Sequence, residues 1–267
     1  MAFNVIYSIR AKVMQMNDIF MCGQHYGAIT NCIEADLHRH WLLQVFISAE
    51  ENLIINVEGQ RINCRAIAVN MNTKHEFYSG NSIHFTMLVD PTTQLGRTLR
   101  IYFLKENPYY IIPEDSAAEL QRYLLNVIHN GENHNYSVLI ENIIRSFDKY
   151  PPVKYDQRIE LLLRRIDACD CEEALHLVNY LAKEMSLSES RLSHLFKKET
   201  GISLKSYIVL HKLQRVYQKI FNGESITQAA IASGFDSSSH FASFNKKMTG
   251  MSARDILTDS RFLKVSL

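Results

Sequence analysis

The sequence predicts an α+β protein: an N-terminal β-barrel with flanking helices, then an all-α C-terminal domain of two helix-turn-helix units joined by a long helix. Three observations carry this prediction. Short apolar strands dominate up to about residue 110, and a helical period replaces them from about residue 113. The stretch 188–203 then recurs without gaps as 237–252, with seven of sixteen positions identical. Such a repeat indicates one supersecondary unit used twice.

The first buried strand of the β region is expected at 41–47. A strand at 53–57, a turn at 58–60, and strands at 62–71 and 83–89 follow, all rich in β-branched and apolar residues. Short strands at this spacing favour a sandwich or a barrel.

Three amphipathic helices are expected after the β region. The first starts at 113–116 with acidic residues in its first turn and ends at Gly131. The second covers about 136–150 and is stopped by Pro151 and Pro152. The third covers about 156–168. The first two could pack on the β region or form a dimer seam, and packing within one chain is the favoured prediction.

Each repeat unit is expected to place a short helix, a turn and a second helix in sequence. The first unit uses 174–184, 185–187 and 188–199, with Ser188 as N-cap. The second uses 226–233, a turn at Gly234 and Phe235, and 237–248. A helix over 204–222 would join the units across about 28 Å, close to the ~34 Å between successive major-groove faces of DNA.

Charge is divided unevenly along the chain. Residues 174–267 hold 13 Lys+Arg against 7 Asp+Glu, whereas residues 1–173 hold 16 against 21. A basic last third suits a nucleic-acid partner. The five scattered cysteines suit reduced thiols, and Cys169 and Cys171 lack metal or redox spacing. Without an expected signal peptide or apolar span, we expect a cytoplasmic protein with no membrane contact.

The segment from about residue 172 to 257 resembles the DNA-binding domain of the AraC/XylS family of bacterial transcriptional regulators. The second unit carries the family pattern through Ala230, Gly234, Phe235, Ser239, Phe241, Lys246, Lys247 and Gly250. The first unit matches it through Ala182, Ser188, Leu192, Phe196, Lys197, Lys198 and Gly201. Two positions depart from the pattern: Asn245 replaces an aromatic residue, for which Phe244 could compensate, and Ala253 stands where proline is frequent.

The resemblance implies that outward residues of each second helix contact DNA. In the first unit these are Ser190, Arg191, Ser193, His194, Lys197 and Lys198; in the second they are Ser238, Ser239, Ser243, Lys246 and Lys247. Arg191 and His194 are the best candidates for base reading, although His194 could instead be a solvated surface residue. The small hydroxyls of the second unit favour phosphate contacts and shape readout. The lysine pairs suit phosphates, or simply helix C-termini.

His38 and His40, with Gln44 four residues further on, resemble the start of a cupin barrel, which is a common sensory domain in this family. The resemblance implies a small-molecule pocket, with its polar candidates at His38, His40, Gln44, Arg65, Lys74 and His75. A metal-binding cupin would need a third histidine, and His75 or His84 would have to serve. We expect a pocket without metal or cofactor. A metal-dependent oxygenase or isomerase is the rival interpretation.

The combined prediction is a transcriptional regulator rather than an enzyme. A cupin-like sensory domain would cover 1–112, a helical dimerisation or linker region 113–169, and a tandem helix-turn-helix domain 170–267. Its expected partners are double-stranded promoter DNA, an unidentified small-molecule effector, a second copy of the chain, and RNA polymerase if it activates. A constitutive DNA-binding regulator without a ligand is the alternative.

Overall fold

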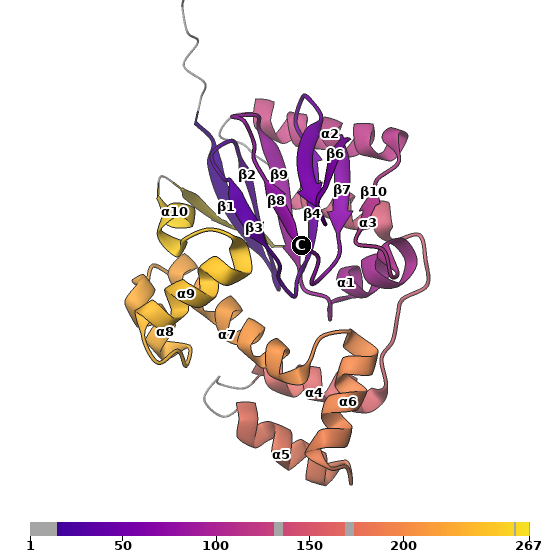
Figure 1. Ribbon diagram of the computed structural model, residues 1–267, viewed down its shortest axis with the longest axis vertical. Helices are drawn as coiled ribbons and strands as arrows, with labels where there is room; N and C mark the ends of the chain where they lie inside the picture. The colour runs from indigo at the N-terminus through magenta and orange to yellow at the C-terminus, as the bar shows by residue number, and fades with distance from the viewer. Residues whose placement is uncertain (1–14, 131–135, 169–173, 259, 267) are drawn as a thin grey trace, which may run out of the picture.

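The computed structural model describes residues 15–130, 136–168, 174–258 and 260–266. A β-rich body carries two helices on its far side, and a string of helices runs below and beside it (Figure 1). The predicted end of a helix at Gly131 and the pair Cys169 and Cys171 lie outside the described residues. No described helix is long and apolar enough to cross a membrane.

The β strands form two sheets. The larger has seven strands in the order β10-β7-β4-β9-β2-β1-β11, and the smaller has four in the order β3-β8-β5-β6. The strands are β1 (Asn17–Cys22), β2 (His25–Thr30), β3 (Ala35–His38), β4 (Leu43–Ser48), β5 (Leu53–Val57), β6 (Gln60–Cys64), β7 (Ala66–Val69), β8 (His75–Phe77), β9 (His84–Val89), β10 (Tyr109–Ile111) and β11 (Arg261–Lys264).

Alternation along the central strand β4 explains how the two faces of the large sheet are covered. Leu43, Val45 and Ile47 belong to the core beneath helices α2 (Glu114–His129) and α3 (Tyr136–Phe147). Phe46 faces the opposite way, into the core between the two sheets. Gln44, on the same side as Phe46, lines a cavity described below.

The predicted fold class is confirmed, and the structure shows that the barrel is open. Among the described strands, none of the pairings joins the two sheets, which face each other as in a sandwich. The predicted strand at 62–71 is divided at Arg65 into β6 and β7, one in each sheet. A short helix α1 (Gln94–Thr98) and a π-helix (Leu99–Leu104) follow β9, where sequence analysis placed no element.

The C-terminal half is helical, as predicted. Its elements are α4 (Gln157–Ala168), α5 (Ala174–Glu184), α6 (Glu189–Thr200), α7 (Leu204–Phe221), α8 (Ile226–Ala232), α9 (Ser238–Thr249) and α10 (Ala253–Leu257). Their apolar faces share one core, in which Leu192, Phe196, Tyr207 and Phe241 are almost fully buried. Burial of these large side chains contributes most of the stability of the short helices.

The predicted central segment, 113–169, does not pack as one unit. Helices α2 and α3 cover the large sheet, whereas α4 belongs to the core of the C-terminal helices. The apolar faces of α2 and α3 are therefore packed within the chain, as the favoured prediction had it.

The end of the described chain returns to the first domain. Strand β11 pairs in parallel with β1, at the edge of the large sheet. Arg261 binds Asp18 through two hydrogen bonds of 2.8 and 2.5 Å, and the Tyr136 hydroxyl donates to the same carboxylate. Segments more than two hundred residues apart thus share one sheet, which ties the two halves of the molecule together.

Candidate nucleic-acid interface and interdomain cavity

The two repeat units begin and end their second helices in the same way. The Ser188 hydroxyl accepts from the backbone N–H of Arg191 at the start of α6, and Ser237 accepts from that of His240 at the start of α9. Gly201 and Gly250 end these helices with φ of 76° and 72°, the left-handed conformation that glycine adopts without a Cβ penalty.

The repeat extends to side-chain hydrogen bonds. The Thr200 hydroxyl donates to the Phe196 carbonyl oxygen at 2.7 Å, and the Thr249 hydroxyl donates to that of Asn245 at 3.0 Å. Each threonine oxygen also accepts from the backbone N–H two residues later, at 3.3 Å in both units. The two units therefore share the backbone path that leaves the second helix.

The candidate DNA-contacting residues of α6 lie together on its outer face. Ser190, Arg191, His194, Lys197 and Lys198 are exposed, and Ser193 is half-buried. Leu192 and Phe196 face inward, as the sequence predicts. The helix therefore presents a polar and basic surface that is free of large apolar groups.

Helix α9 presents a comparable face. Ser239, Ser243, Lys246 and Lys247 are exposed, and Ser238 is half-buried. Sequence reasoning missed His240, which is 53% exposed and lies 3.1 Å from the Asp236 carboxylate. It occupies the repeat position of Arg191, and that correspondence could have identified it.

Asn245, where the family pattern has an aromatic residue, is fully buried. Its Oδ1 accepts from the Tyr217 hydroxyl at 2.5 Å, and its Nδ2 donates to the Met251 carbonyl oxygen at 3.1 Å. The neighbouring Phe244 packs against Trp41 and Phe235, with ring centroids 6.1 and 5.9 Å away. Phe244 thus supplies aromatic contact nearby, and Asn245 satisfies a buried hydroxyl.

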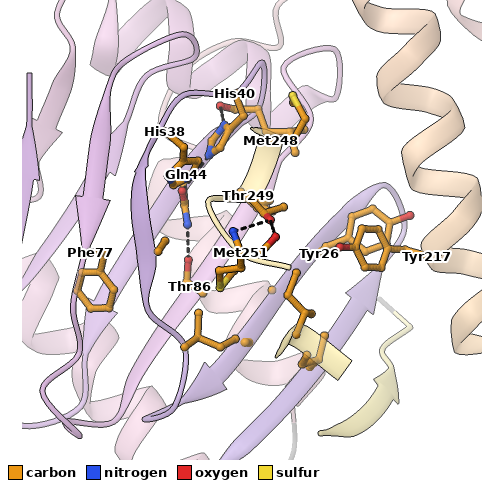
Figure 2. A pocket seen from close by; sticks show the side chains of 18 of the residues that line it. Tyr26, His38, His40, Gln44, Phe77, Thr86, Tyr217, Met248, Thr249 and Met251 are labelled. Atoms are coloured by element: carbon orange, nitrogen blue, oxygen red, sulfur yellow. Dashed lines mark hydrogen bonds between the residues drawn. The ribbon is translucent and has the colours of Figure 1, made fainter. Parts of the chain in front are cut away.

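A cavity of about 110 Å³ lies between the β region and the C-terminal helices. Its walls come from β1, β2, β3, β4, β8 and β9 on one side and from α7, α9, α10 and the segment between α9 and α10 on the other. Figure 2 shows His38, His40 and Gln44 at one end and Tyr26 and Tyr217 at the other, with Met248, Thr249 and Met251 between them. The lining is mostly apolar, which is typical of small-molecule sites.

Four of the six predicted ligand residues line this cavity: His38, His40, Gln44 and His75. Arg65 and Lys74 lie elsewhere. Arg65 forms an ion pair with Glu114 and donates to Gln121, both on α2. Lys74 lines a separate surface hollow that also includes Lys246 and Lys247. Neither residue lies on a strand: Arg65 stands between β6 and β7, and Lys74 directly precedes β8.

The histidines at the polar end of the cavity are neutral at ordinary pH. Burial, followed by the charge of His38, lowers the pKa of His40 to about 4. Burial also lowers the pKa of His75 well below its usual range, with the charges of His40 and His38 acting in the same direction. His84, on the same cavity wall, has its pKa lowered to about 4 by burial.

The β region holds the C-terminal end of each second helix. The Arg100 guanidinium donates to the Glu199 carbonyl oxygen at the end of α6. At the end of α9, a Cβ on Gly250 would lie 2.8 Å from both the Asp36 carbonyl oxygen and His38 Nδ1. Helix α7 is fixed between these points, because its Gln214 donates to the buried Asp90 at 2.9 Å.

Comparisons with known proteins agree with this architecture. A family model described as a helix-turn-helix domain matches residues 181–259. The regulatory protein ada of Salmonella typhimurium is 31% identical over 97 residues, which cover 34% of this chain and 28% of that protein. The chain therefore spans less than a third of the length of this curated relative.

Two solved structures share the fold across both halves. ToxT from Vibrio cholerae O395 is 16% identical with a TM-score of 0.50, covering 85% of this chain and 93% of that one. An apo variant of ToxT from Vibrio cholerae strain SCE256 is 11% identical with a TM-score of 0.54, covering 87% and 96%. Such identities establish the fold alone.

The C-terminal helices thus form a helix-turn-helix domain of the AraC type, joined to a two-sheet β domain as in ToxT. The resemblance of the C-terminal segment to the AraC family is confirmed by the match of its helix-turn-helix region.

Proposed function

We propose that this protein is a sequence-specific transcriptional regulator that binds promoter DNA through α6 and α9. The observation that carries the proposal is the pair of matched helices, each with a polar outer face and a lysine pair near its C-terminal end. A helix of this kind fits the major groove, with its early residues at base edges. The 18-residue α7 separates the two units by about 27 Å along its axis.

Arg191 and His194 are the proposed base readers, because guanidinium and imidazole groups can form directional hydrogen bonds to base edges. Both are exposed on α6. The lysine pairs are proposed to bind phosphates. The serines of α9 support shape and backbone readout, and His240 adds one candidate base contact to that helix.

The interdomain cavity is the proposed effector site. A small molecule bound there would contact the β region and the C-terminal helices at once. It would therefore bind more tightly to one relative placement of the two domains, and this difference in affinity is what a regulatory ligand needs. Within the proposal, the protein acts in the cytoplasm as a homodimer, and it contacts RNA polymerase if it activates transcription.

Genome-wide footprinting of bound DNA, with and without candidate metabolites, tests the proposal. We expect the protein to occupy a limited set of promoters that share a sequence. We also expect this occupancy to change when one class of metabolite is added. Binding only to random sites would contradict the regulator role. Unchanged occupancy with every metabolite would favour a constitutive regulator.

Two variants separate base reading from phosphate binding. Lys197→Ala should weaken binding to all sequences and reduce the salt dependence of log K by about one unit of slope. His194→Ala should relax the preference at one half-site and leave affinity for random DNA nearly unchanged. An equal loss on specific and random DNA in the His194 variant would remove it from the base readers.

A further inference from the structure

Three histidines converge at the polar end of the cavity. His38, His40 and His75 each place a ring nitrogen within 4.8 Å of those of the other two. Their ring centroids lie 4.3 to 5.4 Å apart. His75 is paired opposite His38 across strands β3 and β8, so the sheet itself brings the third ring to the other two.

Backbone carbonyl groups fix the tautomer of each ring. The Nδ1 atoms of His38, His40 and His75 lie 2.7, 2.8 and 2.9 Å from the carbonyl oxygens of residues 36, 42 and 73. A carbonyl oxygen only accepts, so each Nδ1 carries the hydrogen and donates it. The Nε2 atom of each neutral ring is then left with a lone pair. This is the arrangement in which outer-shell carbonyls orient histidines that ligate metals.

The side chain of Gln44 adds an oxygen to the cluster. Its Oε1 lies 3.0 Å from Nε2 of both His40 and His75, and its Nε2 donates to the Thr86 hydroxyl at 2.9 Å. An amide oxygen and two unprotonated ring nitrogens are all acceptors, so no hydrogen bond can form among them. A cation between them would satisfy all of these lone pairs together.

We propose that His38, His40, His75 and Gln44 form a binding site for one divalent transition-metal ion such as Zn²⁺. Three imidazole nitrogens and one oxygen suit zinc, cobalt or nickel. The nitrogens must close to about 3.5 Å from one another to reach bond lengths of about 2.0–2.1 Å. All four residues line the cavity, so a small molecule could approach the ion from the cavity side.

One arrangement of the same residues needs no ion. If the Gln44 amide were turned by half a rotation, its two N–H groups would donate to His40 and His75, and its oxygen would accept from Thr86. The two arrangements make opposite predictions for metal binding by the wild-type chain, so direct titration separates them. The titration uses no DNA, and its outcome is therefore independent of the proposed regulatory function.

The experiment is a titration of the full-length, chelator-treated protein with Zn²⁺ and Co²⁺. Calorimetry and elemental analysis after desalting give stoichiometry and affinity. We expect one ion per chain and visible Co²⁺ absorption bands typical of a nitrogen-rich, low-coordinate site. His75→Ala should weaken binding by more than the roughly 10–100-fold that loss of an outer-shell partner costs.

Matched variants keep the result interpretable. His84→Ala removes a buried histidine of the same cavity outside the cluster, so it should retain the affinity of the wild type. Gln44→Glu exchanges a neutral ligand for a charged one and should tighten binding; circular dichroism checks that each variant folds. The proposal is overturned if the wild type binds less than one ion per chain, or if binding survives in His75→Ala.

Discussion

The two helix-turn-helix units have the same scaffold but different cores. Both use a serine cap, a threonine that bonds back into the helix, and a left-handed glycine. Behind α6, the fully buried Phe196 packs on Tyr207. At the same repeat position behind α9 stands Asn245, bonded to Tyr217. The common features are those that the local backbone requires. The core side chain differs because a different residue packs behind each helix.

The difference follows the surroundings of each unit. Tyr217 lines the cavity and lies 5.8 Å from Tyr26, ring centroid to centroid, so the polar core of the second unit adjoins the proposed effector site. The first unit meets the β region through Arg100. A ligand in the cavity would therefore contact α7 and α9 but not α6. Four experiments test this asymmetry between the two units.

The largest expected effect is on the two core residues. Phe196→Ala should lower the free energy of unfolding by about 3–5 kcal/mol, because it opens a cavity in the shared core. Asn245→Ala should cost about 1–3 kcal/mol, the penalty for leaving the Tyr217 hydroxyl buried without a partner. Urea unfolding measures both, and a cycle with Tyr217→Phe isolates the hydrogen bond. Equal losses from the two alanine variants would mean that the two cores are equivalent.

Acid should weaken the helix that both units share. Burial, followed by the charge of Arg215, lowers the pKa of His211 in α7 to about 4 from an ordinary value of 6.5. Between pH 6.5 and 4 the unfolded chain binds more protons, so this residue lowers the free energy of unfolding by about 1.4 kcal/mol for each pH unit as the pH falls. The loss reaches about 3 kcal/mol.

Chemical unfolding at several pH values should therefore show a smaller acid slope in His211→Gln than in the wild type. Because α7 joins the units, both should lose structure in the same transition. Separate transitions for α6 and α9 would show that the shared helix does not couple them.

The two glycine caps should respond unequally to alanine. Each substitution places a Cβ on a residue in the left-handed region, which should lower the free energy of unfolding by about 1–2 kcal/mol. At Gly201 the new Cβ meets the flexible Arg100 side chain, but at Gly250 it meets the backbone oxygen of Asp36. We expect Gly250→Ala to cost about 1 kcal/mol more than Gly201→Ala in unfolding experiments, because the backbone cannot move aside as a side chain can. A larger loss of unfolding free energy in Gly201→Ala would mean that α6, rather than α9, packs more tightly against the β region.

The smallest effects are expected at the equivalent outer positions Arg191 and His240. Arg191→Ala should reduce discrimination between the specific site and random DNA by about 1 kcal/mol or more. His240→Ala should change it by less than about 1 kcal/mol, because Asp236 already engages its Nδ1 atom and holds the ring. Binding assays on both DNA types at one salt concentration compare them. A greater loss of discrimination in His240→Ala than in Arg191→Ala would mean that the second unit recognises the sequence.

The sequence by itself determined the repeat, its caps and glycine stops, the helical C-terminal half and the buried stripes. Those features depend on interactions between residues a few positions apart, and such interactions leave a periodic pattern. It also identified His38, His40 and Gln44, which lie close together along the chain, and it left His75 and His84 as alternatives for a third histidine.

Only the tertiary structure decided the rest. It brought His75 to the other two histidines, moved Arg65 and Lys74 away from the cavity, and placed β11 beside β1. It also gave Asn245 its partner on α7. These arrangements depend on how the strands pair and on contacts between residues far apart in the chain. Burial and backbone pairing select them only when the whole chain is folded.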